Sequence, residues 1–383
     1  MIRLEGRGFP ALFFIYHHSN TCYIRTMINS FLKLSSAVMI MFMLSACAGV
    51  EPVPAERYFW PPPPDVPRIE WIKAYSSQLD IEKTAMQRFW TSVSGEDQPV
   101  SLVKPLEVKS VPELERFYVS DVGRQAVVVF DLGKHEIRNL VTPPGAPAIQ
   151  HPLSLAYDES YNLYLLERRS NTIIVFDRFE KYLRAIDLSI ISGVRPIALS
   201  LDRKRGRLYV ADGGEKKIHV LDLQGQVLFS FGSGGDNDGQ FNLPIAIAVN
   251  SLGEIVVGDA FSAAVQIFSA EGKFLRKFGR RGDGRGDFQL IKSLAVDSED
   301  NIYVVDGRSH SISVFNQQGE LLLTLGGYYA VASSGKLAPG GFSLPIGIDI
   351  DSTDRMYVVD QLNTRVQVFQ YLSKSYQRKS GTK

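Results

Sequence analysis

The chain has 383 residues, of which 45% are hydrophobic and 11% aromatic, so it carries enough apolar side chains for a large packed core. Its formal net charge is +1, and setting aside residues 1–47 leaves 38 basic and 40 acidic residues, a net charge of −2. Nucleic-acid-binding proteins usually carry the opposite balance, so the composition argues against a nucleic-acid partner.

The N-terminal segment has the pattern of a secretory signal. Lys33 precedes an unbroken apolar run, 37–44, which is shorter than the about 20 residues that a membrane-spanning helix needs. Small residues follow, and the tetrapeptide Leu44-Ser45-Ala46-Cys47 resembles the lipobox of bacterial lipoproteins. The resemblance implies cleavage before Cys47 and lipidation of its thiol. The competing interpretation is a buried free cysteine at the end of a helix.

The lipobox sets the boundaries of the N-terminal region. Met27 begins a signal peptide of ordinary length, 27–46, so we interpret residues 1–26 as an over-long gene prediction. Residues 47–67 form a proline-rich spacer, which favours an extended polyproline II conformation. By resemblance, Ala48 after the lipidated cysteine implies an exported protein anchored to the outer membrane of a Gram-negative bacterium. Only Cys47 remains after cleavage, so stability must come from packing without internal disulfides.

Two elements are predicted between the spacer and the main body of the chain. Arg68–Tyr75 has the length and the β-branched and aromatic content of a strand. The segment 81–93 predicts a short helix packed on the main domain, because its apolar residues fall at helical spacing: Ile81, Ala85, Met86, Phe89, Trp90 and Val93.

Six repeats follow. In each, a strand ends in an acidic residue, and a second strand ends in a bulky apolar residue nine positions later: Asp121/Phe130, Glu167/Phe176, Asp212/Leu221, Asp259/Phe268, Asp306/Phe315 and Asp360/Phe369. The acidic positions are 46, 45, 47, 47 and 54 residues apart, which is the period of a repeat architecture. Each unit contains short β-rich runs separated by turns, and one such antiparallel sheet cannot bury both of its faces. The sequence therefore predicts an all-β fold, a six-bladed β-propeller of four-stranded antiparallel blades.

The repeats also carry a family resemblance. No tryptophan is followed by aspartate, and the segments Phe241–Asp259 and Phe342–Phe369 resemble NHL repeats. The last unit has only three strands before the basic polar tail, 373–383. We therefore predict that Arg68–Tyr75 supplies its fourth strand and closes the ring, giving a propeller that spans 68–372 and leaves no open sheet edge at the seam.

One face of the propeller collects basic side chains. We call it the ligand-side face: it carries the loop that enters each inner strand and the turn between the second and third strands of each blade. The candidate binding residues on it are His151, Glu167, Arg168, Arg169, Arg195, Arg308 and His310. This pattern favours an anionic glycan, lipid headgroup or acidic protein surface as the partner, and the alternative is a solvated rim of mixed charge.

The repeat acids Asp121, Asp212, Asp259, Asp306 and Asp360 are interpreted as turn residues, because a short carboxylate at a strand end accepts backbone N–H bonds. Glu167 departs from the aspartate pattern, which points to blade 2 as the place for a specific site. A second asymmetry lies at the axis, where small residues give way to Glu107, Lys109 and Asp349. We expect Lys109 and Asp349 to form an ion pair in a wet channel, with catalysis as the alternative.

Three classes of function fit these features. The first is a monomeric binding or scaffold module that needs no cofactor and catalyses nothing. The second is a hydrolase or lyase, since related propellers include metal-dependent lactonases. Only four histidines follow Cys47, which argues against a three-histidine zinc site but leaves calcium open: His135, His151, His219 and His310. The third is a factor for export or assembly of another envelope protein, which the sequence does not separate from the first.

Overall fold

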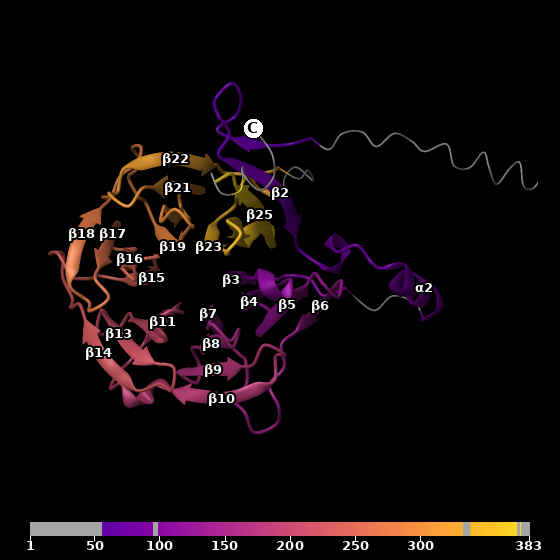
Figure 1. Cartoon of the computed structure of the whole chain (residues 1–383), viewed down its shortest axis with the longest axis horizontal. Coiled ribbons are helices and arrows are strands. Elements are labelled where there is room, and N and C mark those ends of the chain that lie inside the picture. Colours follow the sequence, from indigo (N-terminus) through magenta and orange to yellow (C-terminus); the bar gives the residue numbers. More distant parts are fainter. Residues whose placement is uncertain (1–55, 95–98, 332–337, 374–375, 377–383) are drawn as a thin grey trace, which may run out of the picture. The chain divides into compact units, whose positions relative to one another are not determined.

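β-Branched and aromatic runs separated by Gly- and Asp-containing turns form 25 strands in the part of the chain that the computed structural model describes, residues 56–94, 99–331, 338–373 and 376. The predicted signal peptide, Cys47, most of the spacer and most of the basic tail lie outside these residues. The strands form six antiparallel sheets arranged as blades around an axis (Figure 1). The predicted all-β six-bladed propeller is therefore confirmed.

Blades 1 to 5 are each continuous in sequence, with the first strand innermost. Their strands are β3 (Pro105–Val111), β4 (Arg116–Asp121), β5 (Ala126–Asp131) and β6 (Glu136–Asn139) in blade 1; β7 (Pro152–Tyr157), β8 (Leu163–Glu167), β9 (Thr172–Phe176) and β10 (Tyr182–Asp187) in blade 2; β11 (Pro196–Asp202), β12 (Arg207–Asp212), β13 (Lys217–Asp222) and β14 (Val227–Phe231) in blade 3; β15 (Pro244–Val249), β16 (Ile255–Asp259), β17 (Ala264–Phe268) and β18 (Phe274–Phe278) in blade 4; and β19 (Ile291–Val296), β20 (Ile302–Asp306), β21 (Ser311–Phe315) and β22 (Leu321–Gly326) in blade 5.

Blade 6 joins the two ends of the domain. From the axis outward it contains β23 (Pro345–Ile350), β24 (Arg355–Asp360), β25 (Arg365–Tyr371), β2 (Ile69–Tyr75) and β1 (Phe59–Trp60). The closing strand β2 runs antiparallel to β25, with Ile69 opposite Tyr371 and Tyr75 opposite Val366, as the sequence predicted. The short strand β1 pairs with the outside of β2, so the propeller begins inside the segment that we expected to be spacer.

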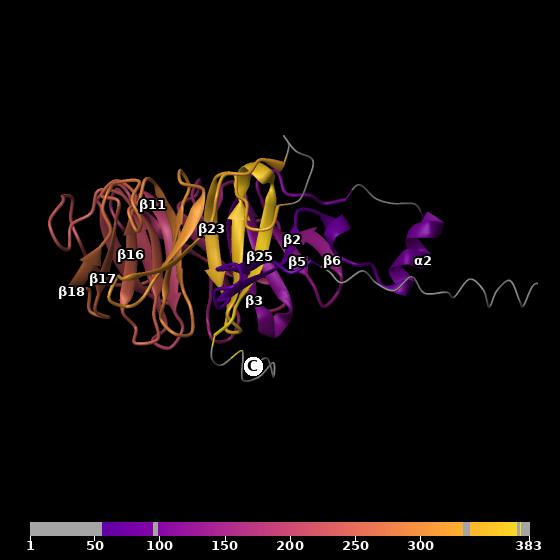
Figure 2. The same cartoon turned by 90° about the horizontal axis from the view of Figure 1, so that it is seen from above.

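The core is divided between the blades. The six clusters of buried apolar side chains each lie between two neighbouring blades, which is why one blade cannot fold alone. Between blades 6 and 1, the rings of Phe117 and Phe130 stack with centroids 4.4 Å apart, and Tyr357 and Tyr75 pack on Phe117 from the last blade and the closing strand. The edge-on view shows the sheets standing side by side around the axis (Figure 2).

The helix differs from its prediction in packing. Helix α2 (Ala85–Ser94) is present, but Ile81 precedes it and is buried in the core between blades 6 and 1. The helix is attached through its polar side, where Gln87 Nε2 donates to the carbonyls of Lys134 and His135. Its apolar residues are exposed: Met86, Phe89, Trp90 and Val93. The prediction that this apolar face packs on the propeller is therefore wrong.

Four single 3₁₀ turns between strands are also found in the described part of the chain. They are η1 (Gln78–Asp80), η2 (Pro112–Leu114), η3 (Leu188–Ile190) and η4 (Gln361–Asn363). No helix within the described ranges has the length and apolar character needed to cross a membrane.

Candidate binding site

The repeat acids fasten the turns of the ligand-side face. Each is buried and accepts hydrogen bonds from the backbone of the loop that enters the inner strand of its own blade: Asp121 from Val103 and Lys104, Asp212 from Arg195, Asp259 from Asn242 and Leu243, Asp306 from Gln289 and Leu290, and Asp360 from Ser343. Except for Asp360, they also accept backbone bonds from the following turn. The carboxylates therefore already accept hydrogen bonds from the backbone of the rim.

Glu167 occupies the same place in blade 2. It accepts from the His151 backbone N–H at 2.6 Å and from both the backbone and the hydroxyl of Ser170. Burial opposes ionisation, but these hydrogen bonds outweigh it and lower the pKa of Glu167. Glu167 therefore has the same role as the turn aspartates, and the exposed basic groups in its own turn are Arg168 and Arg169.

In blade 6 the backbone of the entering loop is held by three side chains, Asp360, Arg365 and His310. Asp360 accepts from the Nε of buried Arg365 at 2.7 Å, and Arg365 Nη2 donates to the carbonyl of Gly341. His310 Nδ1 accepts the backbone N–H of Leu344 at 3.0 Å, so that nitrogen carries no proton. His310 also lies edge-on against Tyr328. Its ring is therefore a structural part of the rim.

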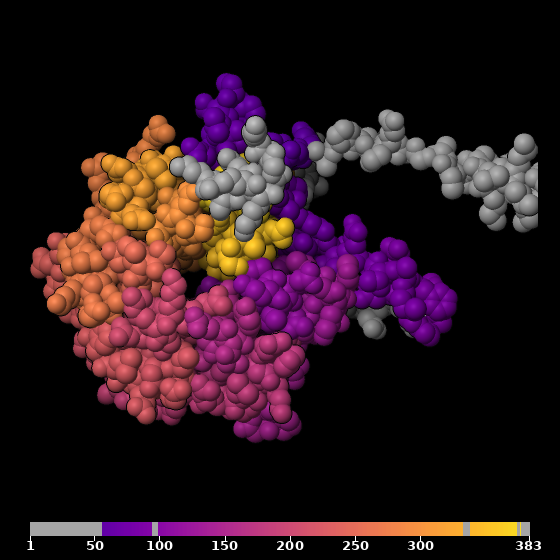
Figure 3. All heavy atoms as spheres, in the orientation of Figure 1, coloured from indigo at the N-terminus to yellow at the C-terminus, as the bar shows by residue number. Residues whose placement is uncertain are grey.

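Basic side chains surround the mouth of the channel. Lys104, Arg168, Arg169, Arg195 and Arg308 are all exposed on the ligand-side face. None of the five forms an ion pair within the described residues. Lys104 and Arg168 line the central cavity itself, which has a volume of about 960 Å³. Figure 3 shows the opening between the blades at the centre of the ring.

Just inside the mouth, one side chain from each blade forms a ring that we call the collar. Its members are Leu106, Leu153, Ile197, Ile245, Lys292 and Ile346, and all six are half-buried and line the cavity. Each follows the first residue of its inner strand, which is a proline in five blades and Ile291 in blade 5. Five of the six are aliphatic, so the collar is an apolar ring with one cation in it.

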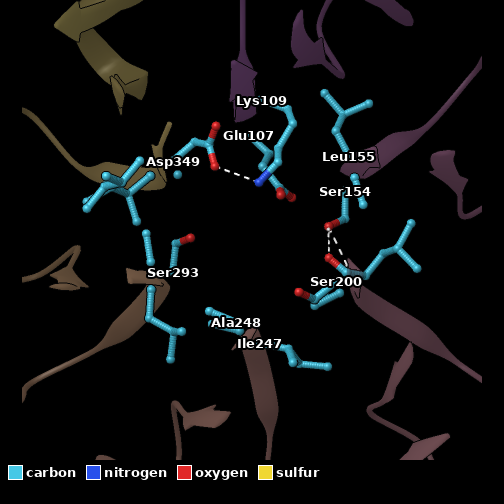
Figure 4. Close-up of a pocket in the computed structure, with 18 of the residues that line it drawn as sticks. Glu107, Lys109, Ser154, Leu155, Ser200, Ile247, Ala248, Ser293 and Asp349 are labelled. Atoms are coloured by element: carbon cyan, nitrogen blue, oxygen red, sulfur yellow. Dashed lines mark hydrogen bonds and ion pairs between the residues drawn. The ribbon is translucent and has the colours of Figure 1, made fainter. Parts of the chain in front are cut away.

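Below the collar the wall is polar on one side. Lys109 Nζ lies 2.6 Å from Asp349 Oδ1, the contact expected from the sequence, and Asp349 also accepts from the Ser110 backbone. Burial alone would lower the pKa of Lys109, but the charge of Asp349 outweighs it and the pKa is raised. Burial raises the pKa of Glu107 to about 8, against the opposing effects of Ser154 and Lys109. Burial therefore favours the neutral form of Glu107, and the opposite charges of Lys109 and Asp349 neutralise each other (Figure 4).

The sequence did not point to two residues at the far end of the channel. The guanidinium of Arg203 lies 4.4 Å from the centroid of the Tyr157 ring, and its Nη1 donates to the Tyr157 hydroxyl. Buried Arg203 Nε has no hydrogen-bond partner among the described residues. Nothing in the turn sequence around Arg203 distinguishes it from a solvated arginine, so only the structure places it here.

The described residues contain no clear set of metal ligands. Among the residues that the structure describes, no group of three or more His, Cys, Asp or Glu side chains could hold a metal ion. Of the histidines, His219 is buried and contacts Ser230 and Asp212, while His135 contacts the backbone of Glu82 away from the channel.

Together, these features define a six-bladed β-propeller with an open central channel. A family model described as a 6-bladed beta-propeller matches residues 244–326, which correspond to blades 4 and 5. No curated protein matches the chain.

Solved structures with the same fold include a streptogramin B lyase, 10% identical with a TM-score of 0.51, covering 73% of this chain and 84% of the lyase. A Bacteroides thetaiotaomicron protein of unknown function is 13% identical with a TM-score of 0.54, covering 70% of each chain. A catalytically inactive virginiamycin B lyase from Staphylococcus aureus with quinupristin is 11% identical with a TM-score of 0.51, covering 73% of this chain and 85% of the lyase. At these identities the likeness concerns the fold alone.

Proposed function

We propose that this protein is an NHL-type propeller lipoprotein of the bacterial envelope, anchored in the outer membrane through Cys47, whose ligand-side face binds a protein or anionic glycan. The observation that carries the binding proposal is the set of exposed basic residues around the mouth, which have no acidic partner in the described part of the chain. A cluster of unpaired like charges beside a cavity favours an anionic partner and speeds its association.

The occupied carboxylates favour binding over catalysis. A hydrolytic propeller needs free acids or bases converging on the cavity, whereas the six repeat acids are buried in turns and Asp349 is paired with Lys109. Glu107 is the one channel acid with a strongly raised pKa, and it supports the alternative of a lyase or hydrolase only if a second reactive group faces it. The metal-dependent form of that alternative has no ligand set in the described residues.

The first test removes the charge at the mouth. Arg168→Ala with Arg169→Ala should lower capture of partners from envelope extracts and weaken the dependence of the remaining capture on salt, since the contacts are electrostatic. Unfolding stability should stay within about 0.5 kcal/mol, because both side chains are exposed. The measurements are pull-downs at several salt concentrations and melting curves.

A matched control lies in the same blade on the opposite face. Arg178→Ala with Lys181→Ala also removes two exposed cations and should leave capture unchanged. If the two double variants behave alike, or if Arg168→Ala with Arg169→Ala captures the same partners at the same salt, the binding face has been misassigned.

The second test concerns the anchor. Cys47→Ser should abolish labelling of the protein by radioactive palmitate and leave uncut precursor in the cell. Cys22→Ser changes the other cysteine of the chain and should leave both labelling and processing unchanged. Unchanged labelling of the Cys47→Ser protein would refute the lipoprotein proposal.

A further inference from the structure

Lys292 replaces an aliphatic side chain in the collar. In blade 3, a Cβ added to Gly213 would lie 3.1 Å from Ile197 Cδ1, which shows that Ile197 lies across this glycine. In blade 5, a Cβ added to Gly307 would lie 2.8 Å from Lys292 Cγ and 3.2 Å from its Cε. The added Cβ would also lie close to the leucine that precedes the next blade, 3.6 Å from Leu243 Cδ1 and 3.2 Å from Leu344 Cδ1, so Lys292 takes the same position in the ring as Ile197.

The position leaves a cation in an apolar ring without an anion. Lys292 is half-buried and forms no ion pair within the described residues. The repeat acid of its own blade, Asp306, already accepts backbone hydrogen bonds from the entering loop and from Arg308 and Ser309. A charged group partly removed from water is stabilised by a counter-charge, so the collar is suited to an aliphatic group that carries a negative charge.

We propose that the collar binds the C-terminal residue of a protein partner, with an aliphatic side chain against the collar and the free carboxylate on the Lys292 ammonium. The proposal rests on the proposed binding function of the ligand-side face and names the part of the partner that enters the channel. Lys104 and Arg168 line the same cavity at the rim, where they would attract acidic residues that precede the partner's C-terminus.

The depth of the apolar layer favours a peptide terminus over a long acyl chain. The collar is one residue thick, and below it the wall mixes the hydroxyls of Ser200 and Ser293 with apolar side chains such as Ala248 (Figure 4). Lys109, Asp349 and Glu107 lie in the same lower part of the channel. One aliphatic side chain fits within the collar, whereas a long hydrocarbon chain would also lie against these charged and hydroxyl groups, which it cannot hydrogen-bond.

The experiment compares three fluorescent pentapeptides on the mature, lipidated protein in detergent, using fluorescence polarisation. The first ends in leucine with a free carboxylate, the second is its C-terminal amide, and the third ends in serine with a free carboxylate. The leucine acid should bind about tenfold or more tightly than its amide, because the amide loses a charge-assisted contact. It should also bind more tightly than the serine acid, because burial of the leucine side chain contributes.

Three substitutions assign the contact. Lys292→Met keeps the length of the side chain and should remove the difference between acid and amide, while Lys273→Met removes an exposed lysine of blade 4 and should preserve it. Melting curves show that each variant is folded. Lys292→Glu should reverse the preference, so that the amide binds better than the acid.

Three results would overturn the proposal: equal binding of acid and amide to the native protein, an unchanged preference in Lys292→Met, or tighter binding of dodecanoate than of the leucine acid, which would identify the ligand as an acyl chain. The proposed function fails by a different result, in which Arg168→Ala with Arg169→Ala captures the same envelope partners at the same salt as the native protein. If that double variant loses capture while one of the three results above is found, the face binds its partner but the C-terminal contact is wrong.

Discussion

Deletion of residues 68–75, which include the whole of β2, should lower the melting temperature by at least about 10 °C and make the protein aggregate. Ile69 is 1% exposed and belongs to the core between blades 5 and 6, and loss of such a side chain alone costs about 2–5 kcal/mol. For a protein of this size, about 1 kcal/mol corresponds to roughly 2–4 °C. The deletion also removes Tyr75 from the core between blades 6 and 1 and leaves β25 as an open edge.

Melting curves followed by circular dichroism, together with the soluble fraction, measure this effect. A pair of point substitutions in the same strand controls for the shortened chain: Ile69→Ser should be strongly destabilising, whereas Ile72→Ser should cost little because Ile72 is 43% exposed. A synthetic peptide containing the β2 sequence should restore part of the lost stability to the deleted protein. Melting of the deleted protein at the native temperature would contradict the role of β2 as the closing strand.

Most of the fold could be predicted because it is repeated. The acidic and apolar positions recur in all six units, so errors in one unit are corrected by the other five. The closing strand followed from counting strands in the last unit. The two-residue strand β1 is not part of the repeat, and it lies in a proline-rich stretch that has the composition of a spacer. The helix was found at the right place, but periodicity shows only that an apolar face exists and not what it contacts.

The site was predictable in part for a related reason. The role of the turn acids followed from their recurrence, and the Lys109 and Asp349 contact followed from the neighbouring positions of the first and last blades. The structure shows that Glu167 makes the same kind of contacts as the aspartates, although its different side chain had suggested a specific site. The cation–π contact of Arg203 depends on the geometry of two adjacent blades, and no spacing in the sequence encodes it.

The buried ion pair of blade 6 should make Asp360 the most sensitive of the turn acids. Arg365 is 3% exposed, and its Nε donates to Asp360 Oδ2 at 2.7 Å. Asp360→Ala would leave this guanidinium buried without a counter-charge, which costs about 3–5 kcal/mol. Asp306→Ala removes only an acceptor of backbone N–H bonds, so we expect about 1–3 kcal/mol there and no change in partner capture.

Urea unfolding curves give both losses of stability, provided that the slope of the unfolding free energy against urea concentration is unchanged. A double substitution separates the causes of the two losses. Arg365→Met removes the cation that Asp360→Ala leaves without a counter-charge, so the double variant should be more stable than Asp360→Ala alone. In Asp306→Ala no such rescue is available, because no buried cation pairs with Asp306 in the described residues. If Asp360→Ala and Asp306→Ala lose the same stability, or if the double variant is no more stable than Asp360→Ala, the buried Arg365 charge is not what makes the blade 6 turn sensitive. If Asp306→Ala melts like the native protein, the structural interpretation of the repeat acids is wrong.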